Sequence, residues 1–264
     1  MIVKAMIVAG SDSCAGAGVQ ADLKTFSAFG VYATTALTLL TAQNTLGITE
    51  TLNVDPLMVS SQIHAIMTDI GAHAIKIGVI PTVDCATEVA KALLIHKAKN
   101  IVLDTVLVST SGHTFGGDAV TKAMVDLLFP IASLVTPNIS ETAILSGTSI
   151  KSLEDLKRSI KIIHDLGAKM IVSTGWIENN SIMDVFYNGK HFHTFESPLI
   201  DGVRVHGAGC TFSSAIAASL ALGLGMKESI SKAKEYVTRA IKSSLEIGKG
   251  LRTLNHFSWR PNEH

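Results

Sequence analysis

Short apolar segments alternate with helix-length segments along almost the whole chain. The apolar segments have the length of buried strands and cover residues 3–9, 32–41, 74–79, 101–104, 132–136 and 169–174. The helical segments cover residues 16–30, 55–70, 82–98, 118–129, 137–146 and 152–166. This alternation predicts a mostly parallel sheet with helices on both faces, which is a three-layer α/β/α fold.

Local signals predict several element boundaries. Asp55 before Pro56 predicts a helix start, because aspartate caps free N–H groups and proline suits the first helical turn. Gly147 predicts a helix end. Asn188-Gly189 separates residues 182–187 from residues 190–195 and predicts a hairpin with a type I′ turn. No linker, repeat or low-complexity run interrupts the chain, so we expect residues 1–264 to form one domain.

Charge and hydropathy exclude two classes of partner. The chain has 22 Lys and Arg and 22 Asp and Glu, so no positive excess predicts binding to nucleic acid or to an acidic membrane. Residues 25–49 carry no charge and are long enough to span a bilayer. Several threonines and two glycines interrupt this stretch, and we therefore expect a soluble protein.

The metal-binding residue types show no pattern typical of a zinc site. Three cysteines are far apart in the sequence and form neither a disulfide framework nor a metal motif, which favours a reducing, cytoplasmic location. A zinc site needs more suitably spaced ligands than a short histidine cluster supplies. We therefore expect surface or packing roles for His191, His193 and His206.

Polar residues and glycines follow the predicted strands. In an open parallel sheet, ligands bind outside the carboxyl ends of the strands. We therefore expect a single crevice lined by Ser11, Asp12, Gln43, Asn44, Gly78, Asp104, Asn138, Thr174 and Gly175.

A glycine loop precedes a long uncharged helix near the end of the chain. The loop contains Gly207 and Gly209, and the helix covers residues 210–224. Such a helix start offers free N–H groups and the positive end of the helix dipole to an anion. Alternatively, the loop needs glycine only for its turn. No Gly-Lys-Ser/Thr follows, so the loop is not a Walker A motif. Together with acidic residues for Mg²⁺, it favours phosphoryl transfer.

Several candidate residues also have a purely structural explanation. Cys210 is either a small buried apolar residue or, with its pKa lowered at the helix start, a general base or nucleophile. Asp22 lies on the apolar face of its helix and needs a partner, either nearby backbone or a ligand. Asn138 and Glu141 have the spacing of a capping box. Asp104 could simply form a turn at the end of its strand.

The order of these motifs carries a family resemblance. The segments are Gly-Ser-Asp at 10–12, residues 16–28, Ala-Gln-Asn-Thr at 42–45, Lys-Ile-Gly at 76–78, Val-Leu-Asp at 102–104, Thr-Pro-Asn at 136–138 with Glu141, and His-Gly-Ala-Gly-Cys-Thr at 206–211. The chain resembles the hydroxymethylpyrimidine/phosphomethylpyrimidine kinases of thiamine biosynthesis, which have a ribokinase-like fold. The resemblance extends over nearly the whole chain.

This resemblance implies an ATP- and Mg²⁺-dependent kinase that acts on a small pyrimidine and then on its monophosphate. It implies that the transferred phosphate meets the loop of Gly207, Ala208, Gly209 and Cys210, with Cys210 as the base. The implied substrate-binding residues are Asp22, Gln43, Val79 and Gly10. The implied nucleotide-binding residues are Asn138, Thr174, Gly175 and Thr211, and the implied metal ligands are Asp104 and Glu141.

The sequence departs from the family pattern at three places. Thr105 stands where the family usually has proline, residues 13–16 replace Pro-Ser-Gly-Gly, and Ser173 stands where a lysine is usual. Ser173 leaves a non-catalytic vitamin-binding protein as one alternative function, and a pyridoxal kinase on the same scaffold is another. The fold class also makes a homodimer an expected assembly.

Overall fold

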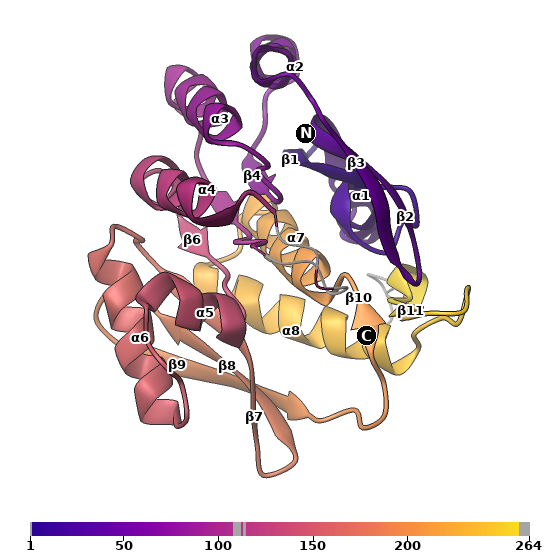
Figure 1. The fold of residues 1–264 in the computed structure, drawn as a ribbon, viewed down its shortest axis with the longest axis vertical. Coiled ribbons are helices and arrows are strands. Elements are labelled where there is room, and N and C mark those ends of the chain that lie inside the picture. Colours follow the sequence, from indigo (N-terminus) through magenta and orange to yellow (C-terminus); the bar gives the residue numbers. More distant parts are fainter. Residues whose placement is uncertain (1, 108–111, 113–114, 259–264) are drawn as a thin grey trace.

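A nine-stranded sheet forms the centre of the computed structural model, which describes residues 2–107, 112 and 115–258. The strands lie in the order β3-β2-β1-β4-β5-β6-β7-β8-β9 (Figure 1). Their bounds are β1 Lys4–Asp12, β2 Tyr32–Asn44, β3 Gly47–Asn53, β4 Ala74–Ile77, β5 Ile101–Leu103, β6 Leu134–Val135, β7 Ile171–Glu178, β8 Ser181–Tyr187 and β9 Phe192–Pro198.

The sheet is mostly parallel, as predicted. The six strands from β2 to β7 across its middle run parallel, whereas β3 at one edge and β8 and β9 at the other pair antiparallel. Residues 47–53, for which the sequence predicted no element, form strand β3. Most side chains of β3 are exposed, so this edge strand lacks the apolar run that identifies a buried strand.

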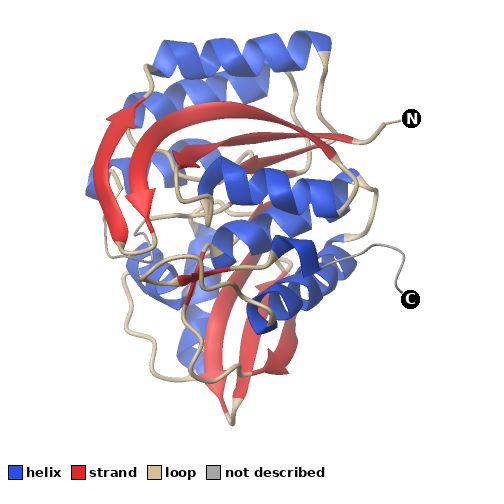
Figure 2. Cartoon of the chain, turned by 90° about the vertical axis from the view of Figure 1, so that its right-hand side faces the viewer, coloured by secondary structure: helices blue, strands red, loops and turns tan. Residues whose placement is uncertain are grey.

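Helices cover both faces of the sheet (Figures 1 and 2). Helices α2 to α6 pack on one face and helices α1, α7 and α8 on the other, so the predicted three-layer α/β/α architecture is confirmed. No helix in the described part of the chain is long and apolar enough to cross a membrane. The bounds are α1 Gly18–Ala28, α2 Pro56–Asp69, α3 Val83–Ile95, α4 Gly117–Ala123, α5 Ile139–Ser146, α6 Leu153–Asp165, α7 Ala208–Ala221 and α8 Met226–Lys242.

Alternation within the central strands explains the two cores. In β1, Met6 and Val8 join the core under α2 and α3, whereas Ala5 and Ile7 join the core under α1 and α7. Side chains that alternate between two buried faces require an apolar residue at almost every position. This is why the strands appear in the sequence as continuous apolar runs.

The predicted helix boundaries hold where a cap was recognised. The Asp55 side chain accepts hydrogen bonds from Leu57 N and Met58 N at the start of α2. Gly147 ends α5 in a left-handed conformation with φ of 65°. Both predictions rested on local chemistry and are confirmed.

The predicted hairpin forms, but the prediction of a two-residue type I′ turn in it is wrong. Tyr187 pairs with Phe192, so four residues connect β8 to β9 instead of two. The two-residue turn occurs in the preceding hairpin, at Asn179 and Asn180, which have φ of 48° and 62°. Two consecutive residues with positive φ are the requirement of a type I′ turn, and asparagine tolerates this conformation.

The C-terminal segment, residues 245–256, returns to the middle of the molecule. It forms the short strand β11, Arg252–Thr253, which pairs parallel with β10, Val205–His206. It also contacts the turn between β2 and β3, because Leu251 N donates to Thr45 O at 2.9 Å and Gly250 N donates to Thr45 Oγ1 at 3.1 Å. The segment therefore connects the β2–β3 turn with the loop that precedes α7.

Candidate functional site

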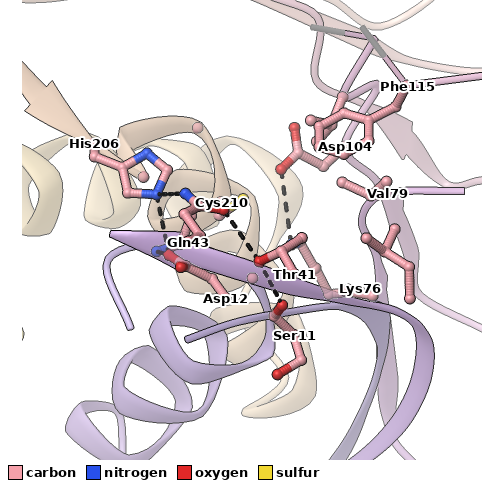
Figure 3. A pocket seen from close by; sticks show the side chains of 18 of the residues that line it. Ser11, Asp12, Thr41, Gln43, Lys76, Val79, Asp104, Phe115, His206 and Cys210 are labelled. Atoms are coloured by element: carbon pink, nitrogen blue, oxygen red, sulfur yellow. Dashed lines mark hydrogen bonds and ion pairs between the residues drawn. The ribbon is translucent and has the colours of Figure 1, made fainter. Parts of the chain in front are cut away.

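A cavity opens at the carboxyl ends of the parallel strands, beside the start of α7 (Figure 3). Its wall combines the ends of β1, β2, β4, β5, β6 and β7 with the glycine loop, defined here as residues 206–210. The lining residues that bear on its chemistry are Gly10, Asp12, Gln43, Lys76, Val79, Asp104, Phe115, Asn138, Glu141, Thr174, His206, Gly207, Gly209 and Cys210. The predicted crevice is therefore confirmed in part: Ser11, Asp12, Gln43, Asp104, Asn138 and Thr174 line the cavity, whereas Asn44, Gly78 and Gly175 do not.

The glycine loop is held close to the loop after β1. Gly207 has φ of 89°, and a Cβ at this position would lie 1.8 Å from Gly16 O, so only glycine fits. The first hydrogen bond of α7 runs from Thr211 N to Gly207 O. The preceding N–H groups, those of Ala208, Gly209 and Cys210, have no acceptor within the helix and lie at the positive end of its dipole. This is the geometry of an anion site.

Asp12 and His206 join the two loops. The Asp12 carboxylate accepts hydrogen bonds from Cys14 N at 2.8 Å, Gly16 N at 3.1 Å and Ala17 N at 2.8 Å. His206 Nε2 lies 3.0 Å from Asp12 Oδ2. Burial opposes ionisation of Asp12, but these hydrogen bonds outweigh it and hold the pKa of Asp12 below its ordinary value. His206 is therefore part of the site wall, and its expected surface or packing role is incomplete.

Lys76 is the centre of a buried charge cluster. Its Nζ lies 3.0 and 2.9 Å from the two carboxylate oxygens of Asp22 and 3.7 Å from Asp104 Oδ2. Burial opposes the charge of Lys76, but the neighbouring carboxylates outweigh this effect and raise its pKa. Gly78 leaves room for the ammonium group, because a Cβ there would lie 2.9 Å from Lys76 Nζ.

Asp22 is not placed to contact a substrate. Its side chain is completely buried, lies outside the cavity wall, and accepts a hydrogen bond from Ser214 Oγ at 2.7 Å in addition to the Lys76 contacts. The expectation that it binds the pyrimidine is corrected: the partner that its buried position requires is Lys76, neither backbone nor ligand. Asp22 acts on the cavity through the lysine.

Cys210 lies at the junction of the cavity and this charge cluster. Its thiol is close enough to the Asp104 carboxylate and to the Gly18 backbone N–H for each of them to influence its ionisation. Burial raises the pKa of Cys210 to about 12, although the charge of Lys76 acts in the opposite direction. The predicted lowering of this pKa at the helix start is therefore wrong, because desolvation outweighs the dipole.

Glu141 has both a structural and a cavity-lining position. Asn138 N donates to Glu141 Oε2 and Glu141 N donates to Asn138 Oδ1, each at 2.9 Å, so the predicted capping box is confirmed. Glu141 Oε1 accepts from Leu107 N at 3.4 Å. Burial, followed by the charge of Asp104, raises the pKa of Glu141 to about 8.

Asp104 and Glu141 have the chemistry that Mg²⁺ requires, although no group of three or more His, Cys, Asp or Glu side chains within the described ranges is placed to hold a metal ion. Ser213 Oγ donates to Asp104 Oδ2 at 3.1 Å, whereas Asp104 Oδ1 faces Gly209 of the glycine loop. Mg²⁺ is commonly held by one or two carboxylates together with substrate phosphates and water. Two carboxylates beside an anion loop fit that pattern.

Three other expected contacts lie outside the cavity wall. Thr211 is completely buried, and its hydroxyl donates to Gly207 O at 2.8 Å and lies 3.0 Å from His256 Nε2, so it supports the loop and is not placed to bind nucleotide. Gly175 N donates to Asp184 Oδ1 at 3.0 Å. Ala208 is also absent from the wall, although its backbone belongs to the glycine loop.

Sequence reasoning missed the role of Lys76 and the pairing of Asp12 with His206, although it placed Asp12 in the crevice. Lys76 carried a usable signal, because it is the one charge in the buried strand Ala74–Ile77. A buried lysine and a buried aspartate on apolar elements require each other. Nothing local indicated that Asp12 and His206 contact each other.

Comparison with known proteins shows the family of the chain. Residues 12–255 match the family described as phosphomethylpyrimidine kinase. The chain belongs to this family. It is therefore a phosphotransferase, and the resemblance stated from its motifs is confirmed.

Individual relatives have similar sequence identity to the chain. It is 38% identical to the hydroxymethylpyrimidine/phosphomethylpyrimidine kinase of Rhizobium meliloti, over 97% of this chain and 98% of the relative. It is also 38% identical to the thiamine biosynthesis bifunctional protein ThiED of Geobacter sulfurreducens, but it spans 52% of that protein's length. The ADP complex of Bacillus subtilis pyridoxal kinase has a TM-score of 0.90 and 38% identity, with 98% of each chain covered.

Two departures from the family pattern acquire contacts of their own. Thr105 Oγ1 donates to Glu141 Oε2 at 3.3 Å, a hydrogen bond that proline could not make. Ser173 is completely buried, with its hydroxyl 2.7 Å from Thr142 Oγ1 of α5. Ser173 therefore points into the packing beneath α5 and leaves Thr174 as the cavity-lining residue of β7.

Proposed function

We propose that the chain is an ATP- and Mg²⁺-dependent kinase in thiamine biosynthesis. It phosphorylates the hydroxymethyl group of 4-amino-5-hydroxymethyl-2-methylpyrimidine and then phosphorylates the resulting monophosphate to the diphosphate. The family of the chain supports this activity. The structural observation that carries it is the meeting, in one cavity, of the glycine loop, Cys210 and the amide of Gln43.

The parts of the cavity divide between the two substrates. Gln43, Val79 and Gly10 offer an amide, an apolar side chain and exposed backbone to a small flat ring. The N–H groups of the glycine loop face the position of the transferred phosphate, where charge is stabilised by fixed donors. Phosphoryl transfer depends mainly on such positioning and on charge neutralisation.

The nucleotide side of the proposal uses the opposite part of the wall. Asn138, which follows β6, forms a parallel bridge with Thr174 of β7, and both would contact the nucleotide. Asp104 and Glu141 would hold Mg²⁺ together with the phosphate oxygens. When bound, this ion would neutralise phosphate charge. In the described cavity wall, the glycine loop and Lys76 contribute to the same neutralisation.

Cys210 is proposed to accept the proton of the substrate hydroxyl. With a pKa of about 12, its thiol is protonated at neutral pH, so it needs an outlet for its own proton. The neighbouring Asp104 carboxylate would provide one. The substrate O–H proton would move to sulfur as the sulfur proton moves to Asp104, while the substrate oxygen forms its bond to phosphorus and ADP leaves.

An ADP-release assay with three acceptors tests the proposal. The acceptors are the hydroxymethylpyrimidine, its monophosphate and pyridoxal. The proposal expects turnover of both pyrimidines; ADP release no faster than without acceptor would refute it. Similarity to a pyridoxal kinase structure makes pyridoxal phosphorylation the second candidate, and faster turnover of pyridoxal than of either pyrimidine would favour it.

The cellular context is also a proposal. Cys14, Cys85 and Cys210 are all free, which supports a reducing, cytoplasmic location. An exposed apolar pair, Leu40 on β2 and Leu52 on edge strand β3, supports a homodimer formed through this face. Light scattering of wild type and Leu52→Glu tests the dimer: the variant should be monomeric, and an unchanged mass would refute this interface.

A further inference from the structure

His206 Nε2 lies near two polar groups, and without a bound hydrogen this nitrogen could not interact favourably with both of them. It is 3.0 Å from Asp12 Oδ2 and 2.8 Å from the amide nitrogen of Gln43 (Figure 3). A ring nitrogen either carries a hydrogen and donates, or lacks it and accepts. The charge state of Asp12 decides which of these holds.

Asp12 is an ionised acceptor. Three backbone N–H groups donate to its oxygens, and together with His206 they hold the pKa of Asp12 low despite its burial. An unprotonated His206 Nε2 would place a lone pair 3.0 Å from a carboxylate oxygen, which is repulsive. His206 Nε2 therefore carries a hydrogen and donates it towards Asp12.

The proton on His206 determines how the Gln43 amide is turned. An amide nitrogen 2.8 Å from a ring N–H would bring two donors face to face. Turning the amide by 180°, an isosteric change, places Gln43 Oε1 at that position instead. The NH2 group then faces Thr41 Oγ1, which is 3.2 Å from the amide and whose own proton goes to Ser11 O at 3.0 Å. The single Nε2 hydrogen is then shared between Asp12 Oδ2 and Gln43 Oε1, and one N–H of the amide meets an acceptor in Thr41 Oγ1.

We propose that His206 is a specificity-determining positioning residue: it holds the oxygen of the Gln43 amide towards the glycine loop and the NH2 group away from it, so that the site selects a ring with a hydrogen-bond donor beside its hydroxymethyl group. This inference rests on the proposed function. His206 itself acts through Gln43.

The direction of the amide matters because the reacting hydroxyl must lie beside Cys210. His206 directly precedes Gly207, so the amide oxygen is on the same side as the glycine loop. The ring substituent next to the hydroxymethyl group is then the one nearest to this oxygen. In 4-amino-5-hydroxymethyl-2-methylpyrimidine that substituent is an amino donor, and the next ring atom is a nitrogen acceptor for the amide NH2.

A pyridine substrate presents a different edge. Pyridoxal carries a formyl acceptor beside its hydroxymethyl group, so two oxygens would face each other. Leaving a buried acceptor opposed in this way typically weakens binding by about 10- to 100-fold. The fixed amide thus disfavours pyridoxal without any change in cavity shape.

Calorimetry with two matched pyrimidines tests the inference. The first is the amino compound and the second is its 4-oxo analogue, 5-hydroxymethyl-2-methylpyrimidin-4-one, in which donor and acceptor are exchanged. Wild type should bind the amino compound about 10- to 100-fold more tightly. His206→Phe removes the N–H, so the amide can turn and the ratio should fall to within about 3-fold, the residual expected for two rings of equal shape.

Two further variants separate orientation from general damage. His191→Phe makes the same exchange at an exposed residue of the β8–β9 loop and should keep the wild-type ratio. Gln43→Glu offers acceptors only, so in this background His206→Phe should leave the ratio unchanged. A ratio that survives His206→Phe, or that falls equally with and without the Gln43→Glu substitution, overturns the inference.

The calorimetric ratio is independent of turnover. If the coupled assay shows no ADP release but the ratio depends on His206 as expected, the proposed function fails and the orientation of Gln43 stands. If ADP is released and the ratio does not respond, the inference fails and the kinase proposal stands.

Discussion

Lys76 Nζ lies 2.9 Å from Asp22 Oδ2, and both side chains are completely shielded from solvent. The pair joins β4 to α1 directly behind Cys210. Its position makes it a support of Cys210, the proposed proton acceptor, and of Asp104 at the same time.

Lys76→Met is expected to destabilise the protein by about 3–5 kcal/mol, because it leaves buried carboxylates without their cation. Urea unfolding of the purified variant measures this loss. Lys91→Met is the matched control, since Lys91 pairs with Glu88 at 2.8 Å on an exposed helix surface and should cost at most about 0.5 kcal/mol. Equal losses in the two variants would contradict the assigned role of Lys76.

Cys210→Ala is expected to lower kcat by about 10²- to 10⁴-fold, the usual contribution of a positioned acid–base group. Steady-state ADP release with saturating pyrimidine and ATP measures it. Cys85→Ala, a change in the core beneath α3, serves as the control for loss of a buried thiol and should retain kcat. A Cys210→Ala enzyme with wild-type kcat would exclude the proposed proton acceptor.

Gly250→Ala is expected to detach the β2–β3 turn from the C-terminal segment, because its Cβ would lie 1.9 Å from Thr45 O. Gln43 is two residues from this turn, so KM for the pyrimidine should rise by about 10-fold or more, as expected when a binding group is displaced. Gly225→Ala introduces the same methyl group where no atom lies within 4 Å. The detachment is disproved if the two variants have the same KM.

His256 predicts a pH dependence of stability. Burial, with the charge of Lys24, lowers the pKa of His256 from 6.5 to about 4. As the pH falls, His256 in the unfolded chain becomes protonated before His256 in the folded protein. The folded state therefore keeps its full stability above pH 6.5 and loses stability as the pH falls towards 4. Between about pH 7 and about pH 5, the free energy of unfolding should fall by about 2 kcal/mol from this residue.

Urea unfolding of wild type and His256→Gln at both pH values checks this slope. Glutamine retains a hydrogen-bonding side chain near Thr211 Oγ1 but does not titrate, and the bond from the Tyr236 hydroxyl to the backbone oxygen of residue 256 is unaffected. The difference in stability between the two proteins should therefore shrink on acidification. A difference that is independent of pH would show that His256 does not bind its proton as described.

The sequence alone predicted the features that depend on neighbouring residues. Period and apolarity identified the parallel strands and the helices, and capping chemistry located the starts of α2 and α5. The same patterns showed that Asp22 needs a partner. They also brought the glycine loop, Asp104 and Asn138 to one edge of the sheet, because the carboxyl ends of parallel strands meet there.

Only the tertiary structure decided which distant residues meet. Lys76 is 54 positions from Asp22, His206 is 194 from Asp12, and Gly250 is 205 from Thr45. No local pattern specifies such partners, since the chemistry of a residue indicates that it needs a contact but not with which segment. The pKa of Cys210 shows the same limit: a helix start predicts a lowered value, and burial, a property of the folded whole, raises it instead.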